Sequence, residues 1–232
     1  MRSFFDRKTI IIYIMILAVF FLLTLCGNQI VTTLAETQIM HNLVVIDAGH
    51  GGVDGGAVSC TGAYESNINL EIALKLNDLM HLLGVRTVMI RETDRSVYTN
   101  GDTIAAKKVS DIKERVRIVN STPKAILLSI HQNNFHDSRY SGAQVFYNAH
   151  SASKNIAEKL QSSFRNNLNP MNKRQSKKSS GVYLMEHANC PGVLVECGFL
   201  SNPEEEANLR NHVYQKKICC VIGTTVSQYL NT

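Results

Sequence analysis

Short apolar runs alternate with amphipathic stretches along most of this 232-residue chain. Apolar and β-branched runs closed by glycine, proline or polar residues are typical of buried strands. The runs of this kind are Leu43–Ile46, Arg86–Ile90, Ala125–Ile130, Gly142–Tyr147, Gly181–Leu184 and Val193–Val195. Apolar residues at three- and four-residue spacing predict helices over Asn67–Leu83, Asp111–Asn120, Ser151–Leu168, Pro203–Leu209 and Tyr214–Leu230. The alternation predicts an α/β fold, a single domain with a mostly parallel sheet flanked by helices.

Two polar stretches interrupt this pattern and are predicted to be loops. Arg91–Ser110 has no clear apolar period, and Asn169–Ser180 is basic as well as polar. Segments without such a period have little apolar surface to bury. We therefore expect both to lie on the surface and the second to be mobile.

The N-terminal segment has the pattern of an export signal. Three basic residues precede an apolar run of 17 residues from Ile10 to Cys26. That length lies between the core of a signal peptide and a membrane-spanning helix. Small residues favour cleavage after Ala35, so residues 1–35 are expected to be a signal peptide or a membrane anchor, followed by a domain over 40–232. The alternative, a buried helix of the domain, is disfavoured because the run is apolar all round.

Composition narrows the classes of function. Hydrophobic residues make up 44% of the chain, enough for a sizeable core. A net charge of +5 is too small to indicate nucleic acid, although it is compatible with an anionic polymer such as a cell wall.

The cysteines show no paired spacing. Cys26 falls in the N-terminal apolar run, which leaves an odd number in the domain: Cys60, Cys190, Cys197, Cys219 and Cys220. Neither a disulfide framework nor a structural zinc ribbon has this arrangement. We expect free thiols that act mainly as small core residues.

Four residues at the edges of predicted elements carry the candidate chemistry. His50 follows the first predicted strand, Glu65 opens the first helix, and His131 and Glu196 stand at the ends of later strands. The carboxyl ends of parallel strands meet at one edge of a sheet, where α/β proteins bind ligands. Two imidazoles and one carboxylate form a zinc ligand set with one open position, and a further carboxylate supplies a general base. The set predicts a zinc hydrolase.

Each of these residues also has an ordinary structural explanation. His50 lies in a glycine-rich turn, Glu65 suits the positive end of a helix dipole, and His131 fits a core histidine. Glu196 is the hardest to explain in this way, because a carboxylate at the end of an apolar strand is costly unless it is paired or functional. Cys197 should face away from Glu196, since side chains alternate along a strand. Among the other histidines, His136 is a weak spare ligand. The rest are expected on the surface or on helix faces and are less suited to a metal site: His41, His81, His150, His187 and His212.

The motifs, taken together and in this order, resemble one enzyme family. They are Val45–Gly52, the Glu65 helix with Asn69-Leu70, Ser129–Asn133 and Val195–Asn202. The chain is similar over about Leu43–Leu230 to the zinc-dependent N-acetylmuramoyl-L-alanine amidases of the amidase-3 type, and within them to the sporulation and germination amidases. It departs from the usual family sequence at Gln132 and Cys197, where no functional group is lost.

The resemblance implies a substrate and a role for each site residue. The substrate would be peptidoglycan, its glycan and stem peptide, cut at the amide between muramic acid and L-alanine. His50, Glu65 and His131 would hold Zn²⁺, and Glu196 would move the proton. The two polar stretches could border a groove for the glycan, although we expect most of their residues to form solvated loops.

The resemblance also implies a place of action, and it leaves alternatives open. The protein would be exported and would act at the membrane or between the membranes of a developing spore, on cortex peptidoglycan, as a step toward muramic δ-lactam. An accessory protein is a possible partner. The open alternatives are a general cell-separation autolysin, a zinc peptidase that cuts stem peptides, and a catalytically silent wall-binding protein.

Overall fold

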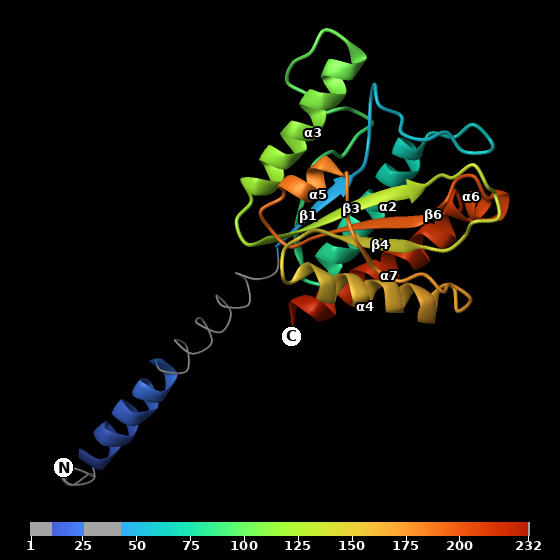
Figure 1. Cartoon of the computed structure of the whole chain (residues 1–232). Helices are drawn as coiled ribbons and strands as arrows, with labels where there is room; N and C mark the ends of the chain where they lie inside the picture. Colours follow the sequence, from blue (N-terminus) through green and yellow to red (C-terminus); the bar gives the residue numbers. More distant parts are fainter. Residues whose placement is uncertain (1–10, 26–42, 232) are drawn as a thin grey trace. The chain divides into compact units, whose positions relative to one another are not determined.

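The computed structural model describes residues 11–25 and 43–231 (Figure 1). The chain divides into two units, Met1–His41 and Asn42–Thr232. Residues 11–25 form a helix inside the predicted apolar run. In the parts of the chain that the structure describes, no helix combines the length and apolar character needed to cross a membrane. The predicted cleavage position after Ala35 lies outside the described residues, as does Cys26.

The second unit is built on one six-stranded sheet of order β2-β1-β3-β6-β4-β5. The strands are β1 (Leu43–Ala48), β2 (Arg86–Met89), β3 (Ala125–Asn133), β4 (Gln144–Tyr147), β5 (Lys177–Lys178) and β6 (Gly192–Phe199). Strands β2, β1, β3 and β6 are mutually parallel, whereas β4 runs antiparallel to β6. The predicted α/β fold with a mostly parallel sheet is confirmed.

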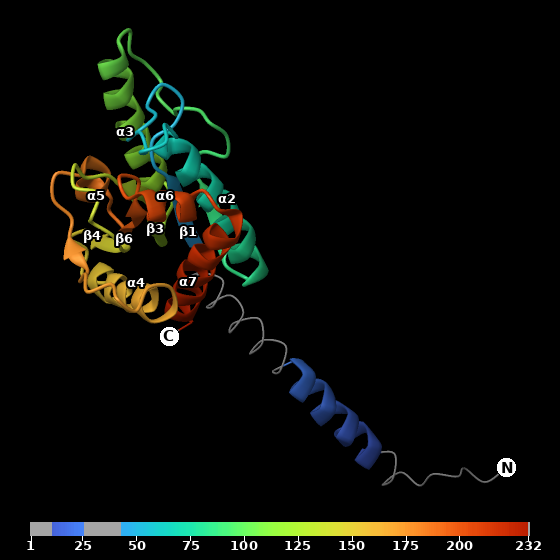
Figure 2. The ribbon, with the colours of Figure 1, turned by 90° about the vertical axis from the view of Figure 1, so that its right-hand side faces the viewer.

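Helices cover both faces of the sheet. They are α2 (Glu65–Leu82), α3 (Ile104–Asn120), α4 (Ser153–Asn167), α5 (Tyr183–His187), α6 (Pro203–Leu209) and α7 (His212–Leu230). Figures 1 and 2 show α2, α4 and α7 on one face and α3 with α5 on the other. The result is a three-layer domain with a separate apolar core on each side of the sheet.

Alternation along the strands decides which residues enter each core. Val44 and Ile46 of β1 pack toward α2 and α7, whereas Val45 packs toward α3 and α5. On β6, Cys197 belongs to the α2 and α7 core, as expected for a side chain opposite to Glu196. The same alternation leaves Glu196 on the α3 face, at the carboxyl end of its strand.

The prediction of a strand over Gly181–Leu184 is wrong. The segment leads into the short helix α5, whose Leu184 and Met185 are buried in the α3-side core. A short apolar run is compatible with either a strand or one buried helical turn, so periodicity cannot separate them.

The predicted loops also need correction. Helix α3 begins at Ile104, where the side chain of Thr103 accepts a hydrogen bond from the Ala106 amide at 3.1 Å. Arg91 is only 1% exposed, so the first polar stretch does not begin on the surface. The second stretch contains β5, which pairs with β4 at the edge of the sheet.

Candidate metal centre

His50 lies two residues beyond β1, in the glycine-rich loop that the strand leads into. Its backbone has φ 61°, in the left-handed region that few non-glycine residues adopt. A guanidinium nitrogen of Arg115 donates to the His50 carbonyl oxygen at 2.6 Å. The strained residue is therefore held by a buried side chain from α3.

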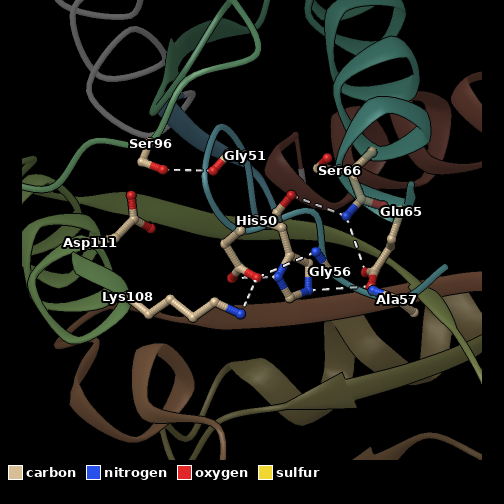
Figure 3. A network of polar contacts seen from close by, with 12 residues as sticks. His50, Gly51, Gly56, Ala57, Glu65, Ser66, Ser96, Lys108 and Asp111 are labelled. Atoms are coloured by element: carbon tan, nitrogen blue, oxygen red, sulfur yellow. Dashed lines mark hydrogen bonds and ion pairs between the residues drawn. The ribbon is translucent and has the colours of Figure 1, made fainter. Parts of the chain in front are cut away.

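Glu65 is the first residue of α2, and its side chain is 5% exposed. Oε2 accepts from the Ala57 amide at 3.0 Å and lies 3.3 Å from Nε2 of His50. Figure 3 shows the carboxylate reaching from the start of the helix toward the His50 ring. Glu65 thus faces both histidines, so its position is not explained by a favourable interaction with the helix dipole alone.

The other oxygen of Glu65 is fixed by a second group of donors. Oε1 accepts from Nδ2 of Asn69 at 3.1 Å and from the Gln132 amide at 3.2 Å. Nε2 of Gln132 in turn donates to Oδ1 of Asn69 at 3.1 Å. Gln132 therefore holds Asn69, the residue that orients Glu65.

His131 comes from the carboxyl end of β3, and its Nδ1 lies 3.0 Å from Oε1 of Glu65. Its ring passes so close to Gly49 that a Cβ there would lie 2.2 Å from Nε2. Glycine is needed at position 49 because any side chain would displace the ring. A Cβ at Gly56 would similarly lie 2.7 Å from Oε2 of Glu65.

The structure brings His50, Glu65 and His131 into one cluster, with one donor atom from each lying within 4.8 Å of the others. Tetrahedral Zn²⁺ with bonds of about 2.0–2.1 Å separates its ligand atoms by about 3.3 Å. Nε2 of His50 lies 3.3 Å from Oε2 of Glu65, and Nδ1 of His131 lies 3.0 Å from Oε1, so each histidine nitrogen stands near that distance from one of the two carboxylate oxygens. Two imidazoles and a carboxylate are also donors that zinc prefers, so the residues fit this metal.

Glu196 stands beside this cluster, as the register partner of His131 on the neighbouring parallel strand. Its Oε2 is buried and has no hydrogen-bond partner among the described residues. An unpaired buried carboxylate oxygen is costly, so Glu196 is a candidate functional residue. Burial raises the pKa of Glu196 to about 7; the charge of His131 opposes this rise, and that of Glu65 adds to it.

The contact between His50 and Glu65 shifts the pKa values of both groups. Burial lowers the pKa of His50, but hydrogen bonds and charge from Glu65 and then Asp54 outweigh it and raise the pKa to about 9. Burial raises the pKa of Glu65, but the hydrogen bonds from His131 and His50 and their charges outweigh it, so the pKa falls well below its usual range. The carboxylate is therefore ionised at any pH near neutrality, as a metal ligand must be.

Two buried arginines support the loop that carries His50, and sequence reasoning missed both. Arg91 donates to the carbonyl oxygens of Ala48 and Gly49 at 2.8 and 3.0 Å. Arg115 donates to the Ala48 carbonyl oxygen at 2.9 Å and forms an ion pair with Asp47. An arginine inside a polar stretch or on an amphipathic helix gives no sequence signal that it will be buried.

The remaining candidates lie elsewhere. His136 is outside the metal-ligand cluster, and its ring lies 4.2 Å from that of Phe135. His41 lies outside the described residues. The five cysteines of the domain are free thiols in the structure, with Cys197 and Cys219 buried.

A three-layer α/β domain that gathers two imidazoles and one carboxylate from the ends of its parallel strands, with a second carboxylate from the start of a helix, has the donor set of a metal-dependent hydrolase. Comparison with known proteins identifies the family. Residues 44–228 match the family described as N-acetylmuramoyl-L-alanine amidase, and the chain belongs to that family of peptidoglycan amidases.

Individual relatives agree with this membership. The germination-specific N-acetylmuramoyl-L-alanine amidase of Bacillus subtilis (strain 168) is 34% identical over 189 residues, which cover 81% of this chain and 79% of that protein. The CwlD amidase from Clostridioides difficile, solved in complex with the GerS lipoprotein, has a TM-score of 0.79 and 36% identity, covering 82% and 98%. The catalytic domain of CwlV from Bacillus (Paenibacillus) polymyxa var. colistinus has a TM-score of 0.69 and 28% identity, with the same coverage.

Proposed function

We propose that this amidase is zinc-dependent, with His50, Glu65 and His131 as the metal ligands and Glu196 as the general base. One observation carries the proposal. Three donor atoms converge within 4.8 Å beside a buried carboxylate oxygen, that of Glu196, which has no partner among the described residues. Structural histidines and glutamates scattered through a fold would not converge in this way.

The roles of the side chains follow from their positions. Zn²⁺ bound at the cluster would polarise the carbonyl of the scissile amide and lower the pKa of an attacking water toward ~7. Glu196 takes a proton from that water and returns it to the leaving nitrogen. The water oxygen would bond to the carbonyl carbon as the amide C–N bond breaks, which leaves a carboxylate on muramic acid and a free amino group on L-alanine.

Product analysis tests the position of the cut. Purified peptidoglycan digested by the full chain should release peptides with new L-alanine N-termini and leave muramic acid without peptide. New termini inside the stem peptide would indicate a zinc peptidase instead. Binding without any product would indicate a catalytically silent wall-binding protein.

The proposed biological substrate is spore cortex peptidoglycan. Support comes from the similarity to a germination-specific amidase at 34% identity and to CwlD at 36%. Removal of the peptide would prepare muramic acid for conversion to muramic δ-lactam by a further enzyme. Deletion of the gene should leave growth intact but remove muramic δ-lactam from cortex digests, so that spores form and germinate poorly. Normal lactam with a failure of cell separation would indicate a general autolysin.

We place the enzyme outside the cytoplasm, either at the membrane or between the membranes of the developing spore. The basic residues and apolar run within residues 1–35 support export as a signal peptide or anchor, ahead of a catalytic domain over 40–232. N-terminal sequencing of the mature protein distinguishes cleavage after Ala35 from retention. An accessory protein is proposed because the similar CwlD amidase was solved with the GerS lipoprotein. Co-purification from sporulating cells tests this part.

A further inference from the structure

Asp54 connects the proposed metal centre to helix α3. It lies four residues after His50, and its Oδ2 is 2.8 Å from Nδ1 of that histidine. Its Oδ1 accepts from Nζ of Lys108 at 2.7 Å and from the Gly56 amide at 3.3 Å. Both oxygens of the carboxylate are therefore committed.

The two nitrogens of His50 face different partners. Nδ1 faces Asp54, whereas Nε2 faces Oε2 of Glu65 at 3.3 Å, on the side of the donor cluster. An imidazole that binds a metal gives up one proton and keeps the other, and a carboxylate beside Nδ1 holds the remaining proton there. The lone pair on Nε2 is then free for a metal. In metal sites, a carboxylate in this position fixes the orientation of the ring and makes the ligand more basic.

Two side chains of helix α3 contact the loop that carries His50. Arg115 donates to its carbonyl oxygen at 2.6 Å, and Lys108, two turns earlier on the same helix, reaches Asp54. Figure 3 shows the Lys108 side chain extended toward the loop that carries His50. The Lys108 side chain is 50% exposed, so its contact is weaker than that of the buried Arg115.

We propose that Asp54 is a positioning residue for the metal centre, which holds His50 with its proton on Nδ1 and Nε2 turned to the metal, and that Lys108 keeps Asp54 in that position. The inference rests on the proposed function, because it takes the cluster to be a metal site. His131 is positioned in another way, by the packing of its ring against Gly49.

Zinc affinity of the metal-free full chain, measured by competition with a chromophoric chelator, tests the proposal. Asp54→Asn keeps the size of the side chain but can present its amide to Nδ1, so the dissociation constant should rise about 10- to 100-fold. Lys108→Met removes the lysine charge from the Lys108–Asp54 ion pair, in which the lysine is half exposed. The dissociation constant for zinc should rise about two- to fivefold.

Two matched variants control for charge. Lys107→Met changes the neighbouring lysine, whose Nζ lies 5.2 Å from the centre of the Tyr98 ring. Asp78→Asn removes an exposed carboxylate from α2. Both should bind zinc as the native chain does. The melting temperature of each metal-free variant shows whether the fold is kept.

The outcomes distinguish the proposed metal site from the proposed positioning role of Asp54. A native chain that binds no zinc overturns the proposed function. A native chain that binds zinc, with an Asp54→Asn variant of equal affinity, overturns the positioning role alone. Weakened binding in Asp54→Asn with native binding in Lys108→Met overturns the part assigned to Lys108. If Asp54→Asn does not fold, Asp54→Ser takes its place, and native affinity in that variant overturns the positioning role; native affinity in Lys108→Met contradicts only the link to α3.

Discussion

His131 on β3 is the register partner of Glu196 on β6. Because the two strands are parallel neighbours, the pairing places a proposed metal ligand and the proposed base side by side on the same face of the sheet. Glu65 then approaches His131 from α2, with 3.0 Å between Oε1 and Nδ1. The sheet register therefore sets the spacing between the proposed ligand and the proposed base.

Loss of one ligand should remove the metal. We expect His131→Ala to lose zinc and activity together, since two donors leave the tetrahedral set incomplete. His136→Ala, five residues further along in an exposed position, is the matched control and should keep both. Full zinc content in His131→Ala, measured by elemental analysis, would remove His131 from the ligand set.

Loss of the base should leave the metal in place. Glu196→Gln keeps the size and polarity of the side chain but cannot accept a proton. Zinc content and melting temperature should stay near native values while kcat falls roughly a hundredfold or more. Loss of zinc in this variant would show that Glu196 is a ligand, and the division of roles would be wrong.

Gly49 should be required for the position of His131. In Gly49→Ala the new Cβ would lie 2.2 Å from the His131 ring, so the ring must move. Activity should fall about a hundredfold, the scale expected for a displacement near 1 Å. Gly62→Ala is the control, because its Cβ meets no atom within 4 Å although φ is +93°. That variant should lose stability at most, and equal kinetics for both variants would contradict the packing argument.

The metal-free chain should become less stable as pH rises toward 9. The pKa of His50 is raised to about 9, while the same group titrates near 6.5 in the unfolded chain. The stabilisation from its protonated form is fully present below pH 6.5 and is lost as pH rises through 9. In urea unfolding of the chelator-treated chain between these limits, His50 should account for about 1–2 kcal/mol, allowing for solvent screening. An equal pH dependence in His50→Gln would assign the effect to other groups.

The free cysteines predict a labelling pattern. In the native chain, Cys60 and Cys220 are exposed and should react quickly with iodoacetamide, whereas Cys197 and Cys219 are buried and should react slowly. Burial also raises the pKa of the Cys197 thiol well above its usual value, which lowers the reactive thiolate fraction. Denatured, unreduced protein should label at all five domain cysteines. Protection of any two would indicate a disulfide.

Much of the fold could be predicted because the strands and helices have clear apolar periods. The strand ends also indicated where His50, His131 and Glu196 would meet, since parallel strands share a carboxyl edge. The start of α3 was missed because the segment before Asp111 is polar on most sides, and its position is set by the Thr103 cap and by Ser110 and Asp111 contacts with the preceding loop.

The supporting residues of the site were harder to predict. Asp54, four residues after His50 in a glycine-rich loop, offered a weak signal for a contact with the imidazole. Lys108 offered none, because a lysine on an amphipathic helix usually points into solvent. The contact forms because α3 covers one face of the sheet beside the loop that carries His50, and such a long-range arrangement is absent from local sequence patterns.

Zinc dependence is best tested by removing and restoring the metal during a peptidoglycan digest. We expect the full chain to carry about one zinc in the three-ligand site, to stop releasing L-alanine N-termini when a chelator removes the metal, and to resume when zinc alone is returned. Release of these termini at an undiminished rate by the metal-free chain would contradict it.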